Sequence, residues 1–136
     1  MTVMLDTNII ISAGVFGGGR LSALTLKIAD EFNIVLSSAI IKELWLVVER
    51  KFPHKKSVLE QFLKRLSYEI SYTPTKIDTD VYPKIRDKKD YPILASAIIA
   101  DVDVFITGDS DFSAVDVERP EIMTIAMFAE KYLWFC

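Results

Sequence analysis

Short apolar runs alternate along the chain with longer stretches whose apolar residues recur every three or four positions. The short runs predict strands at residues 2–5, 34–36, 69–72, 102–106 and 123–125. The longer stretches predict helices at residues 8–15, 21–32, 38–52, 57–67, 79–85 and 93–100, and a last helix that ends near Trp134. Strands and helices are therefore expected to alternate.

Local signals mark the breaks between these elements. Three glycines at 17–19 predict a loop, and no GxxxxGK[ST] pattern surrounds them that would make a phosphate-binding loop. Pro53 ends one helix, while Pro92 suits the first turn of another. Residues 86–90 are expected to form a charged loop and residues 107–111 a polar turn. Nothing resembles a linker, so we predict one domain over residues 1–136.

Alternating strands and helices predict an α/β fold in which a parallel sheet is covered on both faces. In such sheets, ligands bind beyond the carboxyl ends of the strands, at the point where the strand order reverses. Asp6 and Asp109 each follow a predicted strand. We therefore expect the chemistry of the protein at this edge of the sheet.

Composition narrows the class of protein. Hydrophobic residues make up 51% of the chain, but no apolar run reaches the roughly 18 residues of a membrane span. Cys136 is the single cysteine and His54 the single histidine, which excludes an intramolecular disulfide and a Cys/His zinc site. We expect a cytoplasmic location. The net charge of −3 argues against a general nucleic-acid coat, but not against a nuclease whose acidic pocket has a local basic rim.

Four acids lie where an apolar run ends or where a helix begins or continues: Asp6, Glu43, Asp90 and Asp109. Each has an ordinary explanation, because Asp caps helices and forms turns, and Glu43 could lie on a solvated helix face. Together they are harder to explain, since carboxylates gathered at one sheet edge repel one another unless a divalent cation lies between them. Oxygen ligands suit Mg²⁺ or Mn²⁺, so the pattern favours a metal site that acts on phosphodiesters.

The stretches that carry these acids resemble the PIN domain family (PilT N-terminus-like), the nuclease fold of many toxins of toxin–antitoxin systems. The resemblance begins with LDTNIIISA and continues with LSSAIIKEL and DKKDYPILASA. It ends with VDVFITGDSDF, a predicted strand followed by T-G-D-x-D-F. Each motif is weak alone, but the four occur in order over essentially the whole chain. The best match is to a subgroup of toxin components.

The resemblance implies a three-layer α/β/α sandwich with a central, mainly parallel sheet, and an Mg²⁺- or Mn²⁺-dependent endoribonuclease. It assigns the catalytic acids to Asp6, Glu43, Asp90 and Asp109, with Asn8, Thr107 and Asp111 as the polar residues beside them. Tyr91 departs from the subgroup, which often has a further acid at that position. Either Asp109 or Asp111 could face the metal.

Hydrolysis of a phosphodiester requires an activated water and neutralised charge on the transition state, and one or two metal ions supply both. We expect Asp6, Asp90 and Asp109 to hold the metal, directly or through water. Glu43 either bridges through a water or helps to deprotonate the nucleophile. Crowding should raise the pKa of at least one of these carboxyls in the metal-free protein.

Three other functions fit parts of the pattern. A haloacid-dehalogenase-like phosphatase would begin with D-x-D, but the chain has D-T-N there, so the usual acid/base of that class is absent. A catalytically silent α/β binding module would leave the acids as a surface patch, and their completeness argues against it. A PIN protein of RNA processing that is not a toxin is the third.

A PIN toxin implies two macromolecular partners, an RNA substrate and an antitoxin that masks the site. Five apolar residues either line a groove for the antitoxin or belong to the core: Trp45, Leu46, Phe52, Phe62 and Leu66. A second apolar set either supports a homodimer or packs on the sheet: Met127, Phe128, Tyr132, Leu133, Trp134 and Phe135. No membrane association is expected.

Overall fold

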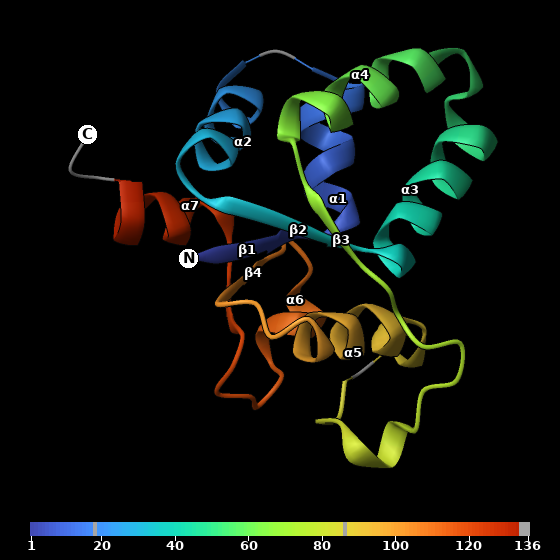
Figure 1. Ribbon diagram of the computed structural model, residues 1–136, viewed down its shortest axis with the longest axis vertical. Coiled ribbons are helices and arrows are strands. Elements are labelled where there is room, and N and C mark those ends of the chain that lie inside the picture. Colours follow the sequence, from blue (N-terminus) through green and yellow to red (C-terminus); the bar gives the residue numbers. More distant parts are fainter. Residues whose placement is uncertain (18, 86, 134–136) are drawn as a thin grey trace.

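The computed structural model describes residues 1–17, 19–85 and 87–133, with the backbone alone for Thr79, Lys88 and Ser113. Five strands form its sheet: β1 (Thr2–Leu5), β2 (Asn33–Ser37), β3 (Glu69–Ser71), β4 (Val104–Ile106) and β5 (Glu121–Met123). All neighbouring strands pair in parallel, in the order β3-β2-β1-β4-β5 (Figure 1). The strand order therefore reverses between β1 and β4, where the two halves of the chain meet.

Helices cover both faces of this sheet. The α-helices and the two π-helical segments that continue them are α1 (Thr7–Ile10), η1 (Ile11–Val15), α2 (Gly19–Glu31), α3 (Ser38–Lys51), α4 (Lys56–Leu66), α5 (Tyr91–Ile99), α6 (Ser110–Ser113), α7 (Ile125–Phe128) and η5 (Ala129–Leu133). Single 3₁₀ turns are η2 (Pro53–Lys55), η3 (Thr79–Val81) and η4 (Lys88–Asp90). Helices α1 to α4 lie on one face and α5 and α6 on the other (Figure 1). This arrangement confirms the expected three-layer α/β/α sandwich.

The central strands carry the core. Val3, Met4 and Leu5 of β1 are completely buried, because helices cover β1 on both faces. On α3, the fully buried Ile40, Leu44 and Val48 recur every four residues, which turns one stripe of the helix towards the core. The Ser37 hydroxyl accepts the Ile40 N–H at 3.2 Å and so caps α3, as the sequence predicts.

Four predicted elements need correction. The helix expected at 79–85 is a single turn, η3, because Pro83 lacks an amide hydrogen and disfavours helical backbone in the residue before it. The expected loop at 86–90 contains η4, and the expected turn at 107–111 includes the start of α6; Arg86 lies outside the described residues. The last strand ends at Met123, since Met123 pairs with Ile106 at the end of β4.

The five apolar residues that either line an antitoxin groove or belong to the core differ in burial. Phe62 and Leu66 are buried in the core between α4 and its neighbours, while Leu46 is 57% exposed on α3. Phe128 and Leu133 are likewise buried, so these two pack inside the molecule, whereas Met127 of the same C-terminal set is 54% exposed. Trp134 and Phe135 lie outside the described residues.

Among the described helices, one bent pair has the length and composition of a membrane span. No described helix is by itself long and apolar enough to cross a bilayer, whereas Thr7–Val15 and Gly19–Glu31 meet the length and composition requirement only together, across a bend of 116°.

Helix η1 approaches α4 closely at Gly14. A β-carbon at Gly14 would lie 2.5 Å from Cδ2 of Phe62, so the ring would have to move. We expect Gly14→Ala to lower the free energy of unfolding by about 1–3 kcal/mol, because added volume strains a packed core. Urea denaturation measures the change. Gly108→Ala is the matched control, since apart from its two chain neighbours no described residue has an atom within 4 Å of the added carbon. Equal stability of the Gly14 variant and wild type would contradict the packing described.

Candidate active site

Asp6 occupies the point where β1 ends and α1 begins. Its N–H donates to the carbonyl of Ile106 at 2.9 Å, which places it between the carboxyl ends of β1 and β4. Its Oδ1 accepts the Thr7 N–H at 2.8 Å and its Oδ2 accepts the Thr107 hydroxyl at 2.7 Å. The side chain is only 5% exposed. Asp6 is therefore a buried, fixed carboxylate at the switch point of the sheet, where α/β proteins bind ligands.

The residues after β4 continue this hydrogen-bond chain. The Thr107 hydroxyl, which donates to Asp6, accepts the Asp109 N–H at 3.0 Å. Asp109 Oδ1 accepts the Asp111 N–H at 2.9 Å and caps the short helix α6. The chain of bonds links the acid of the first strand to the two acids that follow the fourth strand.

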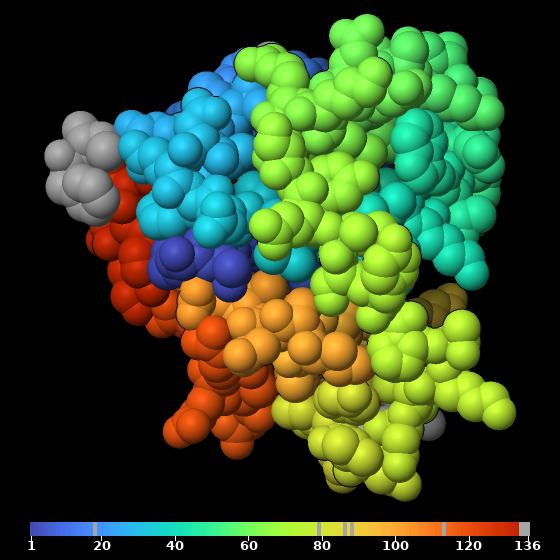
Figure 2. Space-filling model, in the orientation of Figure 1, coloured from blue at the N-terminus to red at the C-terminus, as the bar shows by residue number. Residues whose placement is uncertain are grey.

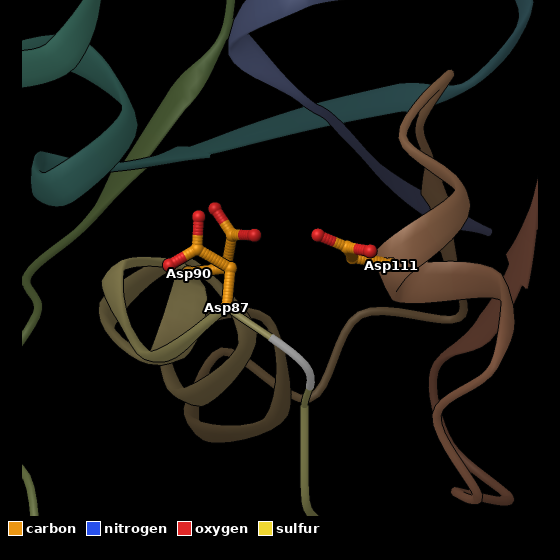
Figure 3. A group of neighbouring side chains, drawn as sticks. All are labelled: Asp87, Asp90 and Asp111. Carbon is orange, nitrogen blue, oxygen red and sulfur yellow. The ribbon is translucent and has the colours of Figure 1, made fainter.

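A third group of acids comes from the start of α5. The carboxylates of Asp87 and Asp90 lie together on one side of the site, and Asp111 points towards them from α6 (Figure 3). One oxygen from each of these three residues lies within 4.8 Å of the others. Asp90 makes no side-chain cap bond to α5, so the capping role that could have explained it is absent. Its carboxylate faces the other acids instead.

Asp87 was not among the predicted site residues. Its Oδ1 accepts the Lys89 N–H at 3.0 Å, and its carbonyl accepts the Asp90 N–H at 3.0 Å. These bonds form the turn η4, which brings two acids spaced three residues apart to the same side. The D-x-x-D spacing at 87–90 was the available sequence signal for Asp87. The prediction of an irregular loop over this segment did not use it.

Two carboxyls of the site have pKa values raised from 3.8 to about 6. For Asp6 the largest cause is burial, which outweighs the hydrogen bonds from Thr107 and Thr7; the charges of Glu43 and Asp109 raise the pKa further. For Asp90 burial is again the largest cause, followed by the charges of Asp109 and Asp87. The expected rise is present, with desolvation rather than crowding as its main source.

The remaining predicted residues lie at different distances from this centre. Glu43, half-buried on α3, is close enough for its charge to raise the pKa of Asp6. Asn8 is exposed on α1, and its side chain forms no hydrogen bond with another described residue. The structure therefore gathers Asp6, Thr107, Asp109, Asp111 and Asp90, adds Asp87 and brings Glu43 to the border.

The donor chemistry suits a hard divalent cation. Asp87, Asp90 and Asp111 offer converging carboxylate oxygens, the ligands that Mg²⁺ and Mn²⁺ prefer. Raised pKa values at Asp6 and Asp90 mean that the ionised cluster is destabilised by its own burial and charge, which a bound cation would relieve. The residues present fit such an ion.

Comparison with known proteins agrees with this geometry. The sequence pattern of the PIN domain family matches residues 2–111, a span that contains every acid of the site. The chain belongs to the PIN domain family. A similar solved structure is that of VapBC2 from Rickettsia felis bound to a DNA fragment from their promoter. The two structures superpose with a TM-score of 0.67 over 90% of this PIN domain and 97% of the other chain. The sequences are 23% identical, so the comparison shows a shared fold. No curated protein sequence matches the chain.

Proposed function

We propose that this PIN domain is a metal-dependent endoribonuclease that hydrolyses phosphodiester bonds in RNA. PIN domains are typically nucleases, and family membership supports a hydrolase. The observation that carries the proposal is the convergence of acids from three separate segments, at Asp6, 87–90 and 109–111, on the switch point of the sheet. Carboxylates with a purely structural role have no reason to gather in this way, because their mutual repulsion is unfavourable.

Each residue has a distinct role in this proposal. Asp90 and Asp111, with Asp87, would hold Mg²⁺ or Mn²⁺ directly, and Asp6 and Asp109 would hold it directly or through water. When bound, the ion supplies an activated water and neutralises charge on the phosphate. Asp109 fixes the first turn of α6 and therefore the position of Asp111. The Thr107 hydroxyl holds Asp6 Oδ2 in place. Glu43 borders the site and would accept a proton from the attacking water or hold that water in position.

The substrate class is tested with a panel of matched substrates. Purified protein with Mg²⁺ is incubated with end-labelled single-stranded RNA, DNA of the same sequence, and a small phosphomonoester. We expect internal cleavage of RNA and no release of phosphate from the monoester. Turnover of the monoester without RNA cleavage would instead support the phosphatase class, and inactivity towards all three substrates would support a silent binding module.

We propose further that the protein is the toxin of a toxin–antitoxin pair and that an antitoxin covers the site. The order of motifs that resembles PIN toxins supports this, as does the fold likeness to VapBC2 over nearly the whole of both chains. Induced expression of the wild type in a bacterium that lacks the antitoxin should arrest growth, and Asp90→Asn should not. Normal growth in both cases would favour a PIN protein of RNA processing.

A further inference from the structure

Thr7 is the first residue of α1, directly after the acid that follows β1. Its side chain is 2% exposed, and its hydroxyl has no hydrogen-bond partner among the described residues. In the surface view, the atoms around α4 cover α1, which Figure 1 draws behind them (Figure 2). A hydroxyl that leaves water without gaining a partner costs free energy, so buried polar groups are nearly always paired. Thr7 is an exception to this rule.

Packing alone does not explain the hydroxyl of Thr7. The other buried hydroxyls in the described part of the chain all form hydrogen bonds: Thr25, Ser37, Ser96 and Thr107. The comparison is closest with Thr25, a fully buried threonine whose hydroxyl donates to the carbonyl of Leu21 at 2.8 Å. Valine has nearly the shape of threonine, so it would fill the space at Thr7 without an unpaired hydroxyl. The hydroxyl of Thr7 therefore calls for a partner that the site itself provides.

The main chain of Thr7 already belongs to the acidic site. Its N–H donates to Asp6 Oδ1 at 2.8 Å, while the other carboxylate oxygen of Asp6 accepts the Thr107 hydroxyl at 2.7 Å. Helix α1 packs against α3, the helix that carries Glu43. Glu43 is close enough to Asp6 for their charges to interact. Thr7 thus lies where α1 meets α3, beside one acid and near a second.

Glu43 is an acceptor that lacks a donor. Its side chain is half-buried, and its carboxylate forms no hydrogen bond or ion pair with another residue of the described chain. A hydroxyl that donates to a carboxylate makes a charge-assisted hydrogen bond, which is stronger than one between neutral groups. A buried donor and a half-buried acceptor, each without a partner, therefore lie on two packed helices beside Asp6.

We propose that the Thr7 hydroxyl donates to the carboxylate of Glu43 when the acidic site holds its cation, and so fixes the position of Glu43. Thr7 is then a positioning residue that acts through Glu43. Repulsion from the neighbouring carboxylates opposes the approach of Glu43, and a divalent cation among them relieves this repulsion. The inference rests on the proposed function, because it concerns the same site, and it adds the group that holds the second acid.

Two substitutions separate the hydroxyl of Thr7 from its methyl group. Thr7→Val keeps the shape and removes the hydroxyl, whereas Thr7→Ser keeps the hydroxyl and removes the methyl. Thr25→Val is the matched control, since it makes the same change at a buried threonine whose hydroxyl has a partner on its own helix. Thr7→Val is also made together with Glu43→Ala. For each protein, calorimetric titration gives the Kd for Mg²⁺, thermal unfolding in EDTA gives the stability, and single-turnover assays give the rate of RNA cleavage.

We expect Thr7→Val to raise the Kd for Mg²⁺ by roughly tenfold and to slow cleavage by a similar factor, as loss of a group that orients a metal-site residue does. Thr7→Ser and Thr25→Val should match the wild type in both measurements. In the Glu43→Ala protein, Thr7→Val should have no further effect on either, because the acceptor is already gone.

Stability in EDTA should change in the opposite direction from metal binding. Thr7→Val should unfold at the wild-type temperature or a few degrees above it, because it removes a buried hydroxyl that has no partner. Thr7→Ser should unfold at a lower temperature, because the contacts of a buried methyl are lost. A residue with a merely structural role would not combine unimpaired stability with weaker binding of the cation.

Three results would overturn the inference: wild-type Mg²⁺ affinity in Thr7→Val, a loss in Thr7→Ser equal to that in Thr7→Val, or the same loss from Thr7→Val with and without Glu43. A wild type that binds no divalent cation would also overturn it, and the substrate panel would then decide the nuclease question separately. If the wild type binds Mg²⁺ but cleaves no RNA, the proposed function fails, while the Mg²⁺ titrations still decide whether Thr7 acts through Glu43.

Discussion

Replacement of Asp90 by Asn is expected to lower the rate of RNA cleavage by roughly a thousandfold while the protein stays folded. The carboxylate of Asp90 lies opposite Asp111 and next to Asp87. It forms no cap bond that folding would need. Asn has nearly the same shape but no charge, so it removes attraction for a divalent cation without leaving a cavity. Single-turnover rates at saturating Mg²⁺ measure the effect, with circular dichroism to confirm folding.

Asp116→Asn is the control for this substitution, because it makes the same chemical change at an exposed acid outside the site. It should cleave RNA at the wild-type rate. Wild-type cleavage by the Asp90 variant would remove Asp90 from the catalytic machinery. A comparable loss in the Asp116 variant would show that overall charge, rather than the site, controls the rate.

Mg²⁺ is expected to stabilise the protein, and more strongly at pH 7 than at pH 5. A cation that binds only the native state adds about 2.7 kcal/mol at a hundred times its Kd. The carboxyls of Asp6 and Asp90 both have pKa values of about 6 without metal. At pH 5 they are largely protonated, and protons compete with the ion. Thermal unfolding at both pH values, with Mg²⁺ or EDTA, measures the difference, which should be several degrees in the midpoint at pH 7.

Without metal the pH dependence has the opposite sign. Because folding raises the pKa of Asp6 from 3.8 to about 6, its contribution to stability is fully present below about pH 4 and is lost as the pH rises through 6. A shift of this size corresponds to about 3 kcal/mol for this buried carboxyl. Asp90 shifts in the same direction.

Asp6→Asn removes the cost of burying the ionised Asp6 carboxyl and leaves the other acids of the site in place. Asn can still cap α1, so the variant should be more stable than wild type at pH 7 in EDTA and should gain less from Mg²⁺. The same substitution at Asp101 serves as a comparison, because the Asp101 carboxylate is exposed and paired with Arg119. An Mg²⁺ effect that is absent at pH 7, or a less stable Asp6 variant, would contradict the assignment of a strained acidic cluster.

The sequence was sufficient to predict those features of the fold that depend only on neighbouring residues. The run of residues 2–5 ends at an acid, and the structure has β1 and Asp6 at those positions. Ser37 caps α3 because its hydroxyl reaches an amide three residues ahead. The end of the short helix expected after Asp78 also depends on a neighbouring residue. Pro83 limits it to a single turn, and the prediction did not take this proline into account.

Other features depend on contacts between distant segments. Helical spacing on α4 shows that Phe62 and Leu66 share a face, but not whether a partner or η1 covers it. Likewise the choice between Asp109 and Asp111 depends on how α6 meets the start of α5. The structure uses Asp109 as the cap and turns Asp111 towards Asp90. The D-x-x-D spacing indicates that Asp87 and Asp90 share one side of a turn, but their approach to Asp111 follows from the same meeting of segments.

The most direct measurement of the central claim is the rate of single-stranded RNA cleavage by the wild type before EDTA, in EDTA, and after Mg²⁺ or Mn²⁺ is returned. A metal ion held by the acids of β1, α5 and α6 predicts loss of cleavage in EDTA and recovery with either ion. Cleavage that continues unchanged in excess EDTA would contradict it.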